Sequence, residues 1–239
     1  MNMSNVEMKF NKLNSSSCEL VIKSEVEGIA TTYASLYRRM LLQSTPCYSV
    51  AGIRCKAGGK FVKNFFESVP NLTGSLIELN TILHNAKFDI VSEDKYIVLT
   101  LELKNKVMLS DLCDPAKTVV SHGSIQGFTL ESKDEILATV AGEGDIVLDI
   151  FLMEGIGYSQ KDVNTQALSN VLGSDAAKDW MITDSQHKGV HNVSYHNDVR
   201  LGKQTVKLVV TSHLNGIEET IRSCTDTIIN QLEEFKGCI

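Results

Sequence analysis

The 239-residue sequence has little of what several specialised protein classes require. It contains only six cysteines, without a CxxC pair, so a disulfide scaffold is not indicated. Its best apolar run, 146–153, is interrupted by Asp149 and is much shorter than the roughly 20 residues of a membrane-spanning helix. The first ten residues lack the apolar core of a signal peptide. We therefore expect a cytoplasmic protein with reduced thiols and no membrane partner.

Basic residues are also scarce. The chain has five arginines and a net charge of -6, with a pI near 5.5. Affinity for phosphate backbones comes largely from clustered lysine and arginine, so we expect no nucleic-acid coating by this chain alone. The 43% hydrophobic and 22% charged residues are close to ordinary globular usage and indicate a folded chain.

Motifs for catalysis are missing. The sequence has no GxSxG, the motif of a nucleophile elbow. Gly58-Gly59-Lys60 lacks the upstream spacing of a phosphate-binding loop, and we expect a hairpin turn there. The glycine pairs at 142–144 and 155–157 are also typical of turns. These segments therefore indicate neither a catalytic loop nor a cofactor site. Cysteine–histidine catalysis stays open, because its partners meet in space and not in sequence.

Three neighbouring histidines leave one alternative open. His187, His191 and His196 could bind zinc in a small metal-dependent hydrolase. In a strand, however, His187 and His191 would share a face and His196 would point the other way. Asp184 and Asp198 lie near but complete no recognised ligand spacing. Surface or packed histidines are the competing interpretation.

The two ends of the chain are similar in pattern. Residues 19–23 alternate like a strand and precede an amphipathic helix at 30–44. Residues 205–213 likewise predict a strand, followed by a long helix with Asn215 as its N-cap and Gly237 at its end.

The middle of the chain predicts mostly short strands. One helix is expected at 74–83, and breaks rich in serine, glycine and aspartate separate the strands. The expected strands are 47–54, 88–91, 96–103, 127–131 and 145–153. This pattern predicts an α+β fold, with a strand-rich domain at 50–168 inserted into a discontinuous domain made of 1–49 and 169–239.

The last helix carries a seam-like apolar stripe. Its spacing is close to the heptad pattern by which two helices pack together. The alternative is a helix that lies on its own sheet. The stripe consists of Ile217, Ile221, Cys224, Ile228 and Phe235, with Leu232 beside it.

The first helix carries a second candidate surface. Arg38 and Arg39 lie off its apolar stripe, and Leu42 is their neighbour on the helix surface. Arginine is enriched at protein interfaces, so an exposed leucine between two guanidinium groups suits a partner. A solvated face with one stray leucine is the alternative.

Four segments resemble the alpha subunit of bacterial-type DNA-directed RNA polymerase. The most specific is 28–46, GIATTYASLYRRMLLQSTP, against the family's GFGxTLGNALRRxLLSSxP. Weaker matches are 69–72 (VPNL against IPGV), 155–158 (GIGY against GRGY) and 184–195 (DSQHKGVHNVSY against DSxFSPVxxVxY). They occur in the family's order over almost the whole chain.

The resemblance implies a fold and a set of contacts. The two ends would form an α/β dimerisation domain, in which the first and last helices of two copies pack together. Beta would bind at Arg38, Arg39 and Leu42, and beta-prime would bind mainly to the second copy. The expected dimer residues are Tyr33, Leu36, Tyr37, Met40, Ile217, Ile221, Cys224, Ile228, Leu232 and Phe235.

The resemblance also implies a function without catalysis. The chain would be a homodimeric assembly scaffold of a nucleotidyltransferase, whose magnesium site belongs to the large subunits. It would act in the cytoplasm or in the equivalent compartment of a bacterial-type organelle. The family's C-terminal DNA-contacting domain is not in this sequence, so we expect no direct DNA contact. A homodimeric interaction protein without a polymerase role is a further alternative.

Overall fold

The computed structural model describes residues 6–131, 133–142, 145–200, 203–212, 214 and 216–237, without the side chain of Phe235. The chain forms two compact units. The first joins Met1–Pro46 to Lys188–Ile239, and the second is Cys47–His187. The sequence-based division instead assigns 169–187 to the discontinuous unit. The mixed, strand-rich architecture confirms the predicted α+β class.

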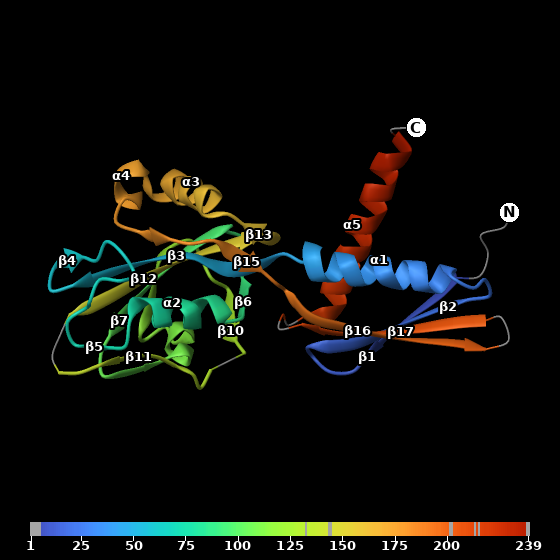
Figure 1. Ribbon diagram of the computed structural model, residues 1–239, viewed down its shortest axis with the longest axis horizontal. Helices are drawn as coiled ribbons and strands as arrows, with labels where there is room; N and C mark the ends of the chain where they lie inside the picture. The colour runs from blue at the N-terminus through green and yellow to red at the C-terminus, as the bar shows by residue number, and fades with distance from the viewer. Residues whose placement is uncertain are drawn as a thin grey trace. The chain divides into compact units, whose positions relative to one another are not determined.

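A four-stranded antiparallel sheet forms the base of the first unit (Figure 1). Strand β17 lies between β2 and β16, so segments from the two ends of the chain are hydrogen-bonded neighbours. The order is β1 (Val6–Lys12), β2 (Ser17–Ser24), β17 (Lys203–Ser212) and β16 (Val190–Arg200). One face carries the buried apolar residues of β2 and β17, as the period-two alternation requires.

Helix α1 (Ile29–Ser44) packs on this apolar face. Its buried residues are Ala30, Ala34, Tyr37, Met40 and Leu41. By helical spacing Ile29 and Tyr33 fall on the same apolar stripe of the helix, yet both are exposed. Alanines four residues apart leave no long side chain between helix and sheet, so the helix approaches the strands along that stripe.

Helix α5 (Ile217–Gly237) packs on the same core only over its first half. Ile217, Ile221, Cys224 and Ile228 are buried there, and the Tyr37 hydroxyl lies 3.1 Å from Thr225 Oγ1 of α5. Beyond Ile228 the described side chains are exposed, and the helix rises away from the sheet (Figure 1). The predicted N-cap, Asn215, lies outside the described residues.

The second unit is built on an eight-stranded sheet. The main strands, in sheet order, are β10 (Gly127–Leu130), β6 (Phe88–Val91), β3 (Cys47–Ala57), β12 (Ile146–Gly155), β7 (Tyr96–Leu103) and β9 (Thr118–His122). Strands β4 (Lys60–Phe61) and β14 (Met181–Ile182) add to β3. The predicted hairpin is confirmed, because Gly58 and Gly59 adopt positive φ between β3 and β4.

Helices cover both faces of this sheet. Helix α2 (Leu76–Asn85) packs into one apolar cluster, and α3 (Lys161–Leu172) packs into another with Phe151 and Trp180. Ser75 and Glu78 form a capping box at the start of α2, a signal that the sequence reading missed. The remaining elements are β5 (Leu72–Thr73), β8 (Lys106–Met108), a 3-10 helix (Leu109–Cys113), β11 (Ile136–Val140), β13 (Gly157–Ser159), α4 (Ser174–Ala177) and β15 (Ser185–His187).

Asp149, which interrupts the apolar run of β12, is a buried ion-pair partner. Its carboxylate accepts bonds from Arg54 Nε at 2.8 Å and from Thr100 Oγ1 at 2.6 Å. The Arg54 guanidinium also lies 5.1 Å from the ring centre of Phe61 and 5.0 Å from that of Trp180. The charge is therefore paired and hydrogen-bonded, as burial requires.

Of the helices that the structure describes, none combines the length and the apolar character needed to cross a bilayer.

Candidate functional site

Helix α1 presents Arg38 and Arg39 on its exposed side, next to strand β16. Arg38 Nε donates to the Val193 carbonyl of β16 at 3.0 Å, which fixes the stem of this side chain. Arg39 Nε donates to Gln43 Oε1, one turn along the helix, at 3.3 Å. Leu42 is half-buried and packs against the core of the unit, whereas the sequence predicted an exposed leucine.

The three predicted beta-contact residues border one cavity of about 430 Å³. Its walls are residues of α1 and one residue of β16: Ala34, Ser35, Arg38, Arg39, Leu42, Gln43 and Tyr195. Tyr195 is exposed and was not predicted as a site residue. Its strand is more than 150 positions away in the sequence, so no local spacing could have connected it with α1.

Arg38 and Arg39 differ from the other arginines in their partners. The three other arginines form ion pairs, namely Arg54 with Asp149, Arg200 with Asp198 and Arg222 with Glu218. Among the described residues, no carboxylate lies within ion-pair distance of Arg38 or Arg39. Two unneutralised guanidinium groups beside a cavity favour a ligand that carries negative charge.

The ten predicted dimer residues divide into buried and exposed sets. Tyr37, Met40 and the four apolar residues at the start of α5 are already buried within one chain. Leu36 is half-buried, while Tyr33 and Leu232 are 41% and 59% exposed. The side chain of Phe235 lies outside the described residues. Among the described residues of the predicted dimer set, Tyr33 of α1 and Leu232 of α5 are thus the exposed ones.

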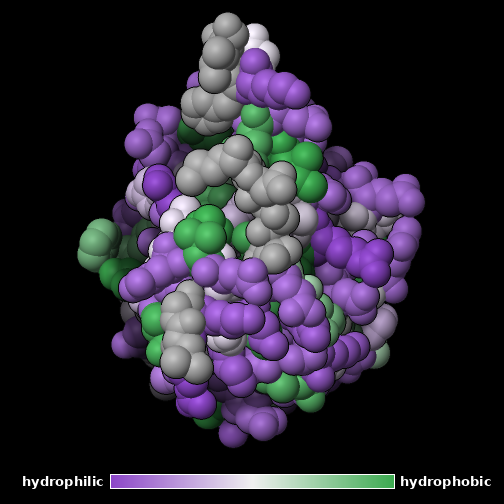
Figure 2. Space-filling view, turned by 90° about the vertical axis from the view of Figure 1, so that its right-hand side faces the viewer, coloured by the Kyte–Doolittle hydropathy of each residue, from purple (hydrophilic) through white to green (hydrophobic). Residues whose placement is uncertain are grey.

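Figure 2 shows apolar side chains gathered below the tip of the upright α5, on the face that carries this helix. Apart from Tyr33 and Leu232, exposed apolar residues of the two helices include Ile29 and Ile229. Exposed apolar side chains of this kind are available for contact with another apolar surface.

The three candidate metal ligands are not arranged as a site. His187 ends β15 and is buried in the second unit, whereas His191 and His196 belong to β16 of the first. The expectation that His187 and His191 share a face of one strand is therefore wrong. Among the described residues, no group of three or more histidine, cysteine, aspartate or glutamate side chains could hold a metal ion.

His187 belongs instead to a buried hydrogen-bond network. Its Nδ1 lies 2.9 Å from the Cys47 carbonyl, and its Nε2 lies 3.1 Å from Ser185 Oγ. Asn164 Nδ2 donates to Ser185 Oγ at 3.2 Å and to the Thr183 carbonyl at 2.8 Å. Ser185 is fully buried and His187 almost so, so this Ser–His pair has no access to a substrate.

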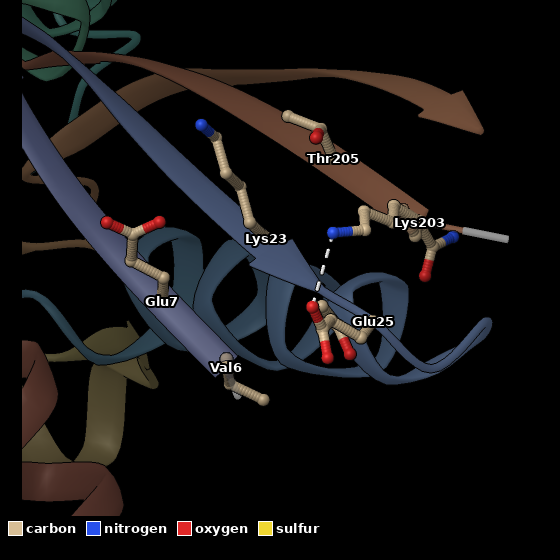
Figure 3. Close-up of a pocket in the computed structure, with 8 residues that line it drawn as sticks. Val6, Glu7, Lys23, Glu25, Lys203 and Thr205 are labelled. Atoms are coloured by element: carbon tan, nitrogen blue, oxygen red, sulfur yellow. Dashed lines mark hydrogen bonds and ion pairs between the residues drawn. The ribbon is translucent and has the colours of Figure 1, made fainter. Parts of the chain in front are cut away.

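A second cavity, of about 640 Å³, lies at one end of the four-stranded sheet (Figure 3). Its charged residues have both signs. Lys203 pairs with Glu25 at 3.2 Å, and Glu7 pairs with Lys9 at 3.0 Å. This cavity therefore lacks the one-sided charge of the arginine cavity.

Three buried cysteines belong to the apolar clusters of the two units. Burial raises the pKa of Cys18, Cys55 and Cys224 to about 11, so their thiols stay protonated near neutral pH.

Comparison with known proteins gives distant relatives. No family model matches the chain. The chain is similar to proteins named DNA-directed RNA polymerase subunit alpha. The one from Borrelia garinii subsp. bavariensis is 21% identical over 198 residues, 80% of this chain and 54% of that protein. The Borreliella burgdorferi protein is 22% identical over 198 residues, with the same coverage of 80% and 54%. A Mycoplasma protein is 24% identical over 169 residues, 68% of this chain and 44% of that protein.

The chain thus spans about half the length of the curated relatives it matches.

Proposed function

We propose that this chain is a non-catalytic alpha subunit of a DNA-directed RNA polymerase. It acts as a homodimeric scaffold on which beta and then beta-prime assemble. The observation that carries the proposal is the unneutralised pair Arg38 and Arg39, which lies beside Leu42 at one cavity of α1. A planar guanidinium suits a fixed protein–protein joint, where lysine would not replace it well.

The dimer would use the exposed apolar ends of two helices. Tyr33 of α1 and Leu232 of α5 are the predicted interface residues that remain uncovered in the single chain. Tyr37 and Ile228, which belong to the same predicted set, are already buried in the core of the unit. This arrangement agrees with both interpretations of the α5 stripe, because its first half lies on the sheet and its second half is open to a partner.

In this proposal, catalysis and DNA contact belong to other parts of the polymerase. Nucleotide addition and its magnesium site would belong to the large subunits, and this chain would need no cofactor. Its net charge of -6 agrees with a role in protein assembly more than in binding a phosphate backbone. A cytoplasmic location follows from this role.

The decisive experiment is co-expression with the beta subunit of the same source, followed by affinity purification and mass measurement. We expect a complex of two copies of this chain with one beta. A clean dimer that never retains beta would overturn the polymerase role and favour a homodimeric interaction protein. A monomer at micromolar concentration would overturn the scaffold itself.

Arg39→Ala tests the site assignment. We expect the dimer to persist and beta affinity to fall by about 2 kcal/mol, the usual loss for an arginine anchor. Arg222→Ala is the matched control, since it removes an exposed arginine that already has a carboxylate partner. Equal beta retention by Arg39→Ala and by the unmodified chain would reject Arg39 as a contact.

A further inference from the structure

Strand β16 is an edge of the four-stranded sheet. Among the strands that the structure describes, it pairs with β17 and with no other. The direction of its free peptide groups follows from the register. The Ser212 amide donates to Ser16 at 2.9 Å, so even-numbered residues of β17 direct their peptide groups toward β2. Odd-numbered residues of β17 therefore bond to β16.

The pairing then determines which residues of β16 bond outward. Odd-numbered residues of β17 pair with even-numbered ones of β16, for example Val209 with Ser194 and Lys207 with His196. The peptide groups of Val193, Tyr195 and the odd residues that follow must point away from the sheet. The bond from Arg38 Nε to the Val193 carbonyl agrees with this, since it reaches the strand from outside the ladder.

This open edge runs directly past the arginine cavity. Tyr195 is 51% exposed and forms the β16 wall of the cavity that Arg38 and Arg39 border. Val199, on the same side of the strand, is also exposed. Among the described residues, no donor or acceptor bonds the outward peptide groups of Tyr195 and Asn197. Open backbone groups, the exposed ring of Tyr195 and two arginines without a carboxylate partner among the described residues thus meet at one cavity.

We propose that an extended segment of the partner subunit adds to β16 as a fifth strand and places a carboxylate side chain on Arg38 and Arg39. Hydrogen bonds from the main chain of Tyr195 and Asn197 to the added segment would set its register against β16. The cavity would accept the acidic side chain of the segment. Charge complementarity identifies this occupant, because a basic or uncharged segment would leave both guanidinium groups unpaired. The inference rests on the proposed function, in that the segment belongs to beta.

Tyr195→Pro and Tyr195→Ala form a matched pair of variants. Both remove the phenol ring, and only proline removes the outward N–H. Proline is tolerated on an edge strand when its missing N–H faces away from the ladder, as it does here. We expect Tyr195→Pro to weaken beta retention at least about tenfold more than Tyr195→Ala, while both variants remain dimeric.

Hydrogen exchange on the unmodified complex gives an independent readout. We expect the amides of Tyr195 and Asn197 to exchange slowly with beta bound and rapidly in the free dimer. Beta retention without this protection would overturn the strand addition and leave the scaffold role intact, as would equal retention by the two variants. Failure of the unmodified chain to retain beta would overturn both proposals, so the two failures are distinguishable.

Discussion

The environment of His187 shows why the spacing of histidines in a sequence is not enough to predict a metal ligand. Its position near two other histidines suggested a metal ligand, yet both ring nitrogens face partners within the second unit. A Cβ added at Gly155 would lie only 2.7 Å from Nε2 of this ring. The imidazole ring of His187 therefore leaves no room for a side chain at position 155. The turn pattern at 155–157 could not indicate this contact.

His187 should make folding stability depend on pH. Burial lowers its pKa below the ordinary 6.5, and the bond to the Cys47 carbonyl opposes this shift. As the pH falls below 6.5, the unfolded chain takes up a proton before the folded chain does. The stabilisation of the fold by neutral His187 is thus fully present above pH 6.5. It is lost as the pH falls through the lower pKa that His187 has in the folded state. We expect His187→Gln to flatten the pH dependence of the unfolding free energy in this range, measured by urea denaturation.

His196→Gln is the control, because it changes an exposed histidine and leaves the buried network intact. Parallel pH profiles for His187→Gln and the unmodified chain would show that His187 does not cause the dependence.

Among the elements, the two helices of the first unit show where periodicity succeeds and where it fails. The extent of α1 was predicted within one residue, since Pro46 and the helical spacing mark it clearly. Its stripe was predicted in part, because Tyr37, Met40 and Leu41 are buried as the spacing indicates. The buried positions Ala30 and Ala34 were missed, since alanine adds little to a hydrophobic pattern although it permits close packing. The α5 stripe was identified, but periodicity cannot tell that burial along the helix ends at Ile228.

Leu232→Glu should separate dimerisation from folding. Leu232 is 59% exposed in the single chain, so a charge there leaves the core of the unit unchanged. In a dimer it would bury a carboxylate in place of a leucine worth about 1.5–3 kcal/mol. We therefore expect at least about a tenfold weaker dimer by sedimentation equilibrium, with an unchanged circular dichroism spectrum.

Asn230→Glu is the matched control for this variant. It adds the same charge to an exposed position on the other side of α5 and should leave the dimer intact. Dimers of equal strength for Leu232→Glu and the unmodified chain would exclude the far half of α5 from the interface.

At the scale of the whole molecule, each apolar cluster lies entirely within one unit. The two clusters of the second unit use residues from Tyr48 to Ile182 only. Its first and last residues, Cys47 and His187, are joined by a hydrogen bond of 2.9 Å. The order of strands and turns predicted the α+β class. It could not locate the change of unit at 187/188, because adjacent strands of similar composition there belong to different cores.

The fragment Cys47–His187 should therefore fold alone. We expect a cooperative thermal transition and native-like circular dichroism, since no buried apolar residue of this unit depends on the other cluster. A fragment ending at residue 168 is the control and should not fold, because it lacks Trp180 and β14. A disordered Cys47–His187 fragment would contradict the autonomy of the second unit.

The position of β17 between β2 and β16 has a consequence for synthesis on the ribosome. Strand β2 emerges early, yet its partner β17 is translated about 180 residues later, after the whole second unit. Tyr195, which completes the arginine cavity, emerges late as well. A nascent or prematurely terminated chain therefore cannot display this surface. Only a chain translated through β17 can complete the four-stranded sheet, so the topology delays formation of this surface until both ends of the sheet have been made.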